Sequence, residues 1–106
     1  MVLTLRNLTL KQLHAVAAIA RLGRITAAAA ELNVTPAALT SRVKQLEEEI
    51  GLPLFDRTSH GLKPTDAGRE LLWAIDSIGV AIEACEAKLE ALKGLTGGRV
   101  AIGVVS

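Results

Sequence analysis

The feature that most constrains this fold is residues 33–51, NVTPAALTSRVKQLEEEIG, because they specify both ends of one helix. Thr35 is a natural N-cap, and Pro36 follows it at a position where its missing N–H is not needed. At the other end, Gly51 suits the left-handed conformation that closes a helix, and Pro53 prevents the helix from continuing. We therefore predict a helix with fixed ends between Thr35 and Gly51.

The two faces of this predicted helix differ in chemistry. Aliphatic residues recur at spacings of four, three and four, as in a helix packed on a core: Leu39, Val43, Leu46 and Ile50. The opposite face carries Ala37, Ser41 and Lys44, with Thr40 beside them, and it ends in the acidic residues 47–49. Small hydroxyl side chains and one lysine suit contact with a groove better than burial in a core.

The segment before this helix predicts a second helix close to it. Residues 25–32, ITAAAAEL, contain four consecutive alanines, which let another helix backbone come near. Asn33 adopts a left-handed conformation at low cost, so Asn33 and Val34 can form a tight turn. Two helices joined in this way form a helix-turn-helix, in which the second helix lies in the DNA major groove.

A further helix should brace this pair. Thr9 and Gln12 form a capping box that opens a helix to about Leu22, and Gly23 closes it. His14 is a lone histidine on an amphipathic helix, so we interpret it as a packing or surface residue. The predicted inner stripe of the helix consists of Leu10, Leu13, Val16, Ala17 and Ala20.

After Gly51 the sequence predicts a β-hairpin, or wing. Residues 54–57 and 62–63 are short extended pieces, and the turn-rich residues 58–61 join them. We interpret Phe55, the one phenylalanine, as the residue that holds the wing against the helices.

The longest regular pattern predicts a long helix that needs a partner. Pro64 ends the wing and Thr65 caps a helix that runs to about Lys93. Its apolar residues alternate at spacings of four and three, and such a seam requires a second helix. We interpret Cys85 in the seam as a small hydrophobic residue, and we expect Trp73, off the seam, to pack on the first helix or on a partner's domain. The predicted dimerisation seam is Leu71, Ile75, Ile78, Ile82, Cys85, Leu89 and Leu92.

Residues 95–98 predict a hinge, and residues 99–106, RVAIGVVS, predict a β-strand with no sheet to join.

Composition limits the function further. Residues 1–65 carry eight Lys or Arg against five Asp or Glu, whereas residues 66–106 carry four against six, so the half with the candidate DNA face is the basic half. No run approaches the roughly 20 apolar residues of a membrane span, and no signal peptide is evident, so we expect a cytoplasmic protein. One cysteine and two distant histidines make no metal site, and no nucleophile–base pair or phosphate loop suggests an enzyme. We expect neither metal nor cofactor.

Residues 8–65 resemble the winged helix-turn-helix of the LysR-type transcriptional regulators. Three departures from the family pattern concern four positions: Arg24 replaces a serine cap, Pro36 and Ala37 replace Gln-Pro, and Thr40 replaces serine. The matching residues are Leu13, Val16, Ala17, Gly23, Ala28, Ala29, Leu32, Thr35, Val43, Leu46, Glu47, Ile50, Gly51, Leu54, Phe55, Arg57, Thr65, Ala67 and Gly68.

The resemblance implies a mainly α fold. It comprises a winged helix-turn-helix of three helices plus a β-hairpin wing in residues 1–65, and a linker and dimerisation helix in residues 66–93. Residues 94–106 would be a hinge and the first strand of a truncated effector-binding domain. The linker helix would pair antiparallel with that of a second copy, and the full-length protein would form a tetramer. A small-molecule inducer would bind only in the missing domain. The closing segment is similar to that of the branch that controls carbon-dioxide-fixation genes.

The resemblance also implies how DNA is bound. A homodimer would occupy an interrupted dyad in promoter DNA, with the wing tip and His60 near the minor groove. The residues expected to contact phosphates are Arg24, Arg42, Lys44, Arg57 and Lys63, and those expected near base edges are Thr35, Pro36, Ala37, Thr40 and Ser41.

Two alternatives remain open from the sequence. Arg57 could instead form an ion pair with Asp56 or with residues 47–49. The chain could also be a protein-interaction or dimerisation module without DNA readout, although that hypothesis leaves the basic, hydroxyl-rich face of residues 35–44 unused.

Overall fold

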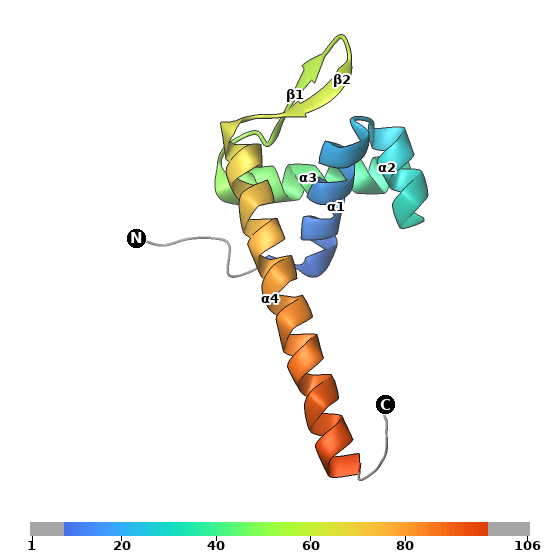
Figure 1. The fold of residues 1–106 in the computed structure, drawn as a ribbon. Coiled ribbons are helices and arrows are strands. Elements are labelled where there is room, and N and C mark those ends of the chain that lie inside the picture. Colours follow the sequence, from blue (N-terminus) through green and yellow to red (C-terminus); the bar gives the residue numbers. More distant parts are fainter. Residues whose placement is uncertain (1–7, 98–106) are drawn as a thin grey trace. The chain divides into compact units, whose positions relative to one another are not determined.

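The computed structural model describes residues 8–97. Their elements follow in the order α1 (Leu10–Leu22), α2 (Ile25–Leu32), α3 (Pro36–Ile50), β1 (Phe55–Thr58), β2 (Gly61–Pro64) and α4 (Asp66–Gly97) (Figure 1). The contacts divide the chain into two units, residues 1–75 and residues 76–106. The predicted winged helix-turn-helix with a long final helix is confirmed. No helix within residues 8–97 is long and apolar enough to cross a membrane.

α1 forms as its capping box predicts. The Gln12 N–H donates to Thr9 Oγ1 at 3.2 Å, and the Thr9 N–H donates back to Gln12 Oε1 at 2.9 Å. The predicted inner stripe is wrong at Leu10, whose side chain is 65% exposed. α1 lies between two apolar clusters, so its buried surface is wide and centres on Val16 and Ile19. Leu10, at the first position of the helix, lies outside both clusters.

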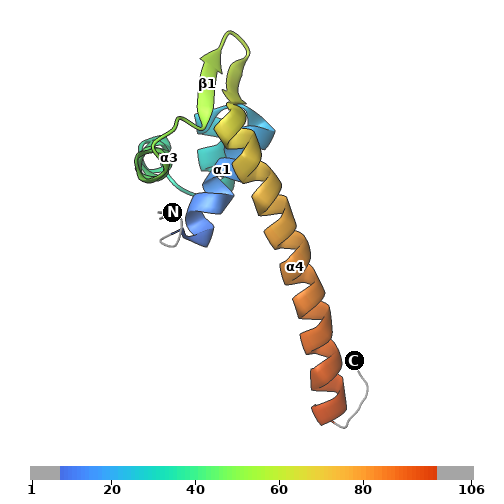
Figure 2. The ribbon, with the colours of Figure 1, turned by 90° about the vertical axis from the view of Figure 1, so that its left-hand side faces the viewer.

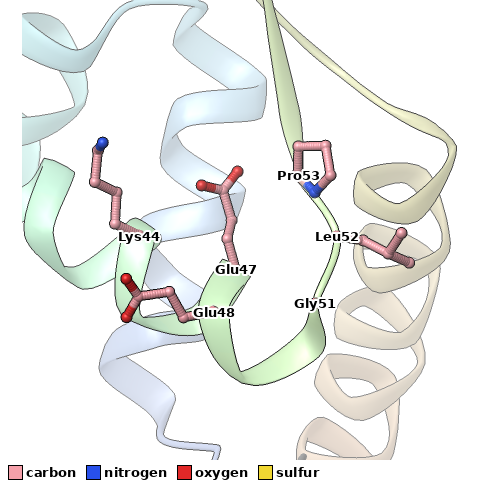
Figure 3. Close-up of a pocket in the computed structure, with 6 residues that line it drawn as sticks. All are labelled: Lys44, Glu47, Glu48, Gly51, Leu52 and Pro53. Atoms are coloured by element: carbon pink, nitrogen blue, oxygen red, sulfur yellow. The ribbon is translucent and has the colours of Figure 1, made fainter.

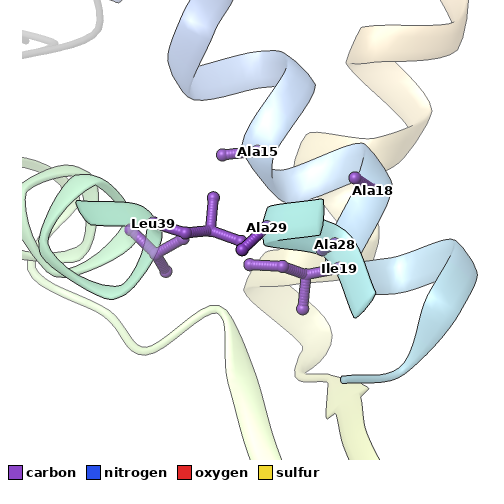
Figure 4. Close-up of a cluster of buried hydrophobic side chains, with 7 residues drawn as sticks. Ala15, Ala18, Ile19, Ala28, Ala29 and Leu39 are labelled. Atoms are coloured by element: carbon purple, nitrogen blue, oxygen red, sulfur yellow. The ribbon is translucent and has the colours of Figure 1, made fainter. Parts of the chain in front are cut away.

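The first cluster is built mainly from alanines. Ile19 is its largest α1 residue, and Leu39 from α3 is fully buried beside it (Figure 4). Small side chains let the three helices approach closely, as the run of four alanines predicted. The cluster consists of Ala15, Ala18, Ile19, Ala28, Ala29, Leu39 and Val43.

The second cluster joins α1, α3, the segment before β1 and the start of α4. It consists of Leu13, Val16, Leu46, Leu54 and Leu71. Leu71 is 8% exposed, and Ile75 packs against the same cluster. The seam prediction is therefore wrong for Leu71, because this residue faces the core of residues 1–75 instead of a second helix. The periodicity of a helix does not distinguish these two destinations.

β1 and β2 form an antiparallel wing that pairs Phe55 with Pro64 and Thr58 with Gly61. Phe55 packs against both clusters, which confirms its predicted role. β1 begins one residue later than predicted, and Leu54, which precedes it, is fully buried in the second cluster.

α4 differs from the sequence prediction at its end. It continues to Gly97, so residues 95–97 are helical where a hinge was predicted. Trp73 is 72% exposed, so its side chain is not buried among the described residues, and its packing on a partner's domain stays a prediction. The remaining hinge residue and the predicted strand 99–106 lie outside the described residues.

Candidate nucleic-acid interface

The N-terminus of α3 is fixed by the residues that the sequence indicated. Thr35 Oγ1 accepts a hydrogen bond from the Ala38 N–H at 3.1 Å, and Pro36 occupies the first turn. Leu39 and Leu46 are almost fully buried, so the opposite side of the helix is directed to solvent. Figure 2 shows α3 nearly end-on, at the edge of the helical part of residues 8–75.

The exposed side of α3 forms one continuous face, called here the α3 face. A shallow hollow runs along it, and Ser41 lies between Ala37 and Gln45 at helical spacing. Ala38, beside Ala37, is exposed too. Sequence analysis did not include Gln45, although its position four residues after Ser41 was a sufficient signal. The hollow is bordered by Ala37, Thr40, Ser41, Lys44, Gln45 and Glu48.

Two predicted contact residues of α3 are less available than expected. Arg42 is half-buried, and it lies about 100° around the helix from Ser41, on the flank that turns toward the core. The phosphate contact expected of Arg42 therefore stays a prediction, and it would come from a different flank of α3 than that of Lys44. Thr35 is exposed, but its hydroxyl oxygen is already the N-cap acceptor.

The acidic end of α3 has a structural use. Glu47 Oε2 accepts a hydrogen bond from the Leu54 N–H at 2.7 Å. Figure 3 shows the Glu47 carboxylate turned toward the segment that leads into β1. This contact ties the end of α3 to the base of the wing. Lys44, Glu47 and Glu48 border a second hollow with Gly51, Leu52 and Pro53. Negative charge here repels phosphates, so it limits the α3 face at this end.

Thr65 completes the base of the wing. Its hydroxyl donates to the Pro53 carbonyl oxygen at 2.6 Å and accepts from the Gly68 N–H at 3.1 Å. Its own N–H donates to the Leu54 carbonyl oxygen at 2.9 Å. The cap on α4 was predicted, but the contacts with residues 53 and 54 were not, because they join residues far apart in sequence.

The strand register places the two cations predicted to contact DNA from the wing, Arg57 and Lys63, on opposite faces of it. Side chains alternate between the faces of a strand, so Asp56 and Lys63, which are directly paired, share one face. Arg57, paired with Leu62, lies on the other face. This alternation also explains why Arg57 forms no ion pair with its neighbour Asp56. Arg57 takes part in none of the ion pairs between described residues.

Local hydrogen bonds order the wing tip. The Thr58 hydroxyl donates to the Gly61 carbonyl oxygen at 2.7 Å, and the His60 N–H donates to Thr58 Oγ1 at 3.1 Å. Ser59 Oγ lies 3.2 Å from His60 Nδ1. His60 is therefore exposed at a defined position on the tip.

Arg24 is the one predicted contact that comes from the turn between α1 and α2. It is exposed and precedes α2 without a side-chain capping bond. Within residues 8–97 no group of three or more His, Cys, Asp or Glu side chains could hold a metal ion.

Comparison with known proteins identifies the family to which this arrangement belongs. The family pattern described as "Bacterial regulatory helix-turn-helix protein, lysR family" matches residues 10–69. The chain belongs to the LysR family. The LysR match runs from α1 into the first turn of α4, so it includes every residue predicted to contact DNA.

Similar LysR-family proteins are named as transcriptional regulators. The HTH-type transcriptional regulator CbbR of Rhizobium meliloti (strain 1021) is 44% identical over 102 residues, which cover 96% of this chain and 33% of that protein. The RuBisCO operon transcriptional regulator of Allochromatium vinosum is 40% identical over 100 residues, covering 94% and 33%. The chain thus spans about a third of the length of these relatives. These relatives are regulators and not enzymes, as the sequence predicted.

A solved structure shares the LysR fold in contact with DNA. The "Crystal structure of CbnR_DBD-DNA complex" superimposes with a TM-score of 0.71 and 27% sequence identity. The superposition covers 80% of this chain and 98% of that one. The fold of this chain therefore agrees with the family match, which identifies residues 10–69 as a LysR-type helix-turn-helix domain.

Proposed function

We propose that this chain binds specific sequences of double-stranded DNA as a homodimer and is the DNA-binding part of a bacterial LysR-family transcriptional regulator. The observation that carries this proposal is the α3 face, which is capped, exposed and lined by small polar side chains and a lysine. The similar structure that is titled as a complex with DNA also supports DNA binding by this fold.

Phosphate contacts supply most of the affinity in this proposal. Lys44 on the α3 face, Arg57 and Lys63 on the wing, and Arg24 beside α2 are exposed cations within residues 8–75. Each phosphate that they neutralise releases counterions, so binding weakens as salt increases. The half-buried Arg42 contributes less to this surface than the sequence suggested.

In this proposal the side chains of the α3 face from Pro36 to Gln45 recognise the bases. Pro36 and Ala37 offer apolar contact, which suits a thymine methyl group, and Ser41 can donate to or accept from several base edges. Thr35 and Thr40 assist from the rim. Gln45 adds an amide that can pair with an adenine through two hydrogen bonds. His60 at the wing tip approaches the minor groove.

The homodimer in this proposal uses the part of the seam that remains exposed. Ile78, Ile82, Leu89 and Leu92 are each at least 40% exposed, and Cys85 lies among them. An apolar row of this length is stabilised by burial against a second helix. Ile75 lies at the edge of the row, whereas Leu71 belongs to the core.

The dimer would place two α3 faces on an interrupted dyad in promoter DNA. We assign residues 1–65 to the DNA-binding domain and the following helix to pairing, in the cytoplasm. We propose that the longer regulator forms a tetramer and carries an effector-binding domain that binds the inducer. The relative named for the RuBisCO operon suggests promoters of carbon-dioxide-fixation genes as targets.

The test is a selection from duplex DNA with a randomised central region. We expect the 106-residue chain to enrich a sequence with two related half-sites. An unenriched pool, bound with little dependence on salt, would contradict the proposal and favour the protein-interaction module.

A further inference from the structure

β2 has a hydrogen-bonding neighbour on each of its edges. β1 pairs with one edge. On the other edge, the Leu62 N–H donates to the Gly23 carbonyl oxygen at 2.8 Å. Gly23 ends α1, so the wing is hydrogen-bonded to the turn between α1 and α2, which lies far earlier in the sequence.

Gly61 makes this approach possible. Its φ of +111° is one that L side chains rarely adopt, and a Cβ atom added there would lie 2.5 Å from the Gly23 carbonyl oxygen. That distance is well inside van der Waals contact with a backbone atom. Any side chain at this position would push the wing away from the turn.

Arg24 is brought to the wing by the same contact. It follows Gly23 directly, and its Cγ lies 4.0 Å from the place where a Gly61 Cβ would be. Its side chain makes no capping bond to α2 and is exposed. Arg24 is therefore a neighbour of β2, although the sequence places it with the helices.

We propose that Arg24 and the wing form one DNA-contacting surface whose geometry is set by the Leu62–Gly23 hydrogen bond and the Gly61–Gly23 approach. The inference rests on the proposed DNA binding and deepens it. Guanidinium groups bind phosphates and enter narrow A·T-rich minor grooves. The surface would thus read the DNA beside the segment that α3 contacts, and Gly61 is a positioning residue for that readout.

The test compares Gly61→Ala and Arg24→Ala with Gly51→Ala as a matched control. Gly51 also has a positive φ, +84°, but an added Cβ there has no neighbour within 4 Å. The two glycine variants therefore share the cost of backbone strain, whereas only Gly61→Ala disturbs the contact between the wing and the turn.

The first readout needs no DNA. We expect the Leu62 amide to be protected from hydrogen exchange in the parent chain and in Gly51→Ala, and to exchange at least about tenfold faster in Gly61→Ala. Equal protection of Leu62 in all three proteins would overturn the coupling between the wing and the turn, whatever the DNA results.

The second readout is the base preference selected from a randomised duplex pool. Arg24→Ala and Gly61→Ala should both lose the preference flanking the α3 site and keep the central one, while Gly51→Ala keeps both. Each loss should lower affinity for the parent's selected duplex by about tenfold. The double variant should cost less than the sum of the two, because both changes act on one surface.

The outcomes separate this inference from the proposed function. Intact flanking preference in Gly61→Ala, or fully additive losses in the double variant, would overturn the shared surface while DNA binding stands. A parent chain that selects no sequence would overturn the proposed function and the DNA-contacting role of the surface together, even if Leu62 behaves as expected in hydrogen exchange.

Discussion

At the scale of single residues, Lys44 has the most direct assignment. It is exposed where the hollow of the α3 face approaches the acidic end of the helix, and we expect it to contact a phosphate. Lys44→Ala should weaken binding to all duplexes about equally and reduce the slope of log affinity against log salt by about one per protomer. Lys88→Ala removes the same charge from an exposed position of α4 and should leave binding unchanged. Altered base preference with an unchanged salt slope would contradict the phosphate contact.

Ser41 and Gln45 should instead govern base preference. We expect Ser41→Ala and Gln45→Ala to change discrimination at particular base pairs by about 1–3 kcal/mol, because direct hydrogen bonds to base edges have that value. Titration of a set of single-base variants of the selected duplex measures this. If the base preferences of both variants were identical to those of the parent chain, recognition would depend on the wing and on DNA shape instead of on α3.

The sequence predicted α3 well at this scale because its signals are local. Thr35, Pro36 and Gly51 specify the ends of the helix within one turn of themselves. The sequence prediction was wrong for Leu10, because the exposure of this residue depends on how the neighbouring elements pack. Apolar or basic character alone does not determine which flank of a helix a second element covers.

At the scale of elements, the wing carries a charge pair with a testable effect. Asp56 and Lys63 are opposite each other in the strand register and share one face of the wing. The Asp56 carboxylate therefore offsets the attraction of Lys63 for phosphates. Asp56→Asn should raise DNA affinity by up to about fivefold, measured by fluorescence anisotropy. Asp76→Asn, an equal charge change on an exposed residue of α4, should have no effect. Lower affinity for Asp56→Asn would show that this face turns away from the DNA.

The existence of the wing was predictable, but its attachment was not. Alternating residues and a turn-rich tip indicated the two strands. The contacts of Thr65 with Pro53 and of Leu62 with Gly23 join segments that no local pattern connects. They determine the direction of the wing, and with it the location of Arg57 and Lys63.

At the scale of the whole molecule, the proposed pairing uses the exposed seam of α4. Ile78→Glu with Ile82→Glu should give monomers in sedimentation analysis, because burying like charges in an apolar interface is unfavourable by several kcal/mol. Val80→Glu is a matched control, since Val80 is 67% exposed and lies about 200° around the helix from Ile78. Dimers that persist in the double variant, or monomers in the parent chain, would show that the seam serves another purpose.

The seam also shows that apolar periodicity predicts a helix more reliably than it predicts the interface in which the helix is buried. Its regular spacing correctly predicted one long helix, yet Leu71 at its start packs within residues 1–75. One regular apolar spacing along a helix can contribute first to the core of its own chain and then to an interface with a second chain. Only the position of the neighbouring elements shows where one ends and the other begins.

The most direct test of the central claim is the salt dependence of binding to the selected duplex and to a shuffled duplex. If Arg24, Lys44, Arg57 and Lys63 of both protomers contact phosphates, log affinity should fall against log salt with a slope of about −7. The selected duplex should bind at least about a thousandfold more tightly than the shuffled one. A slope near zero, or equal affinity for the two duplexes, would contradict sequence-specific DNA binding by this chain.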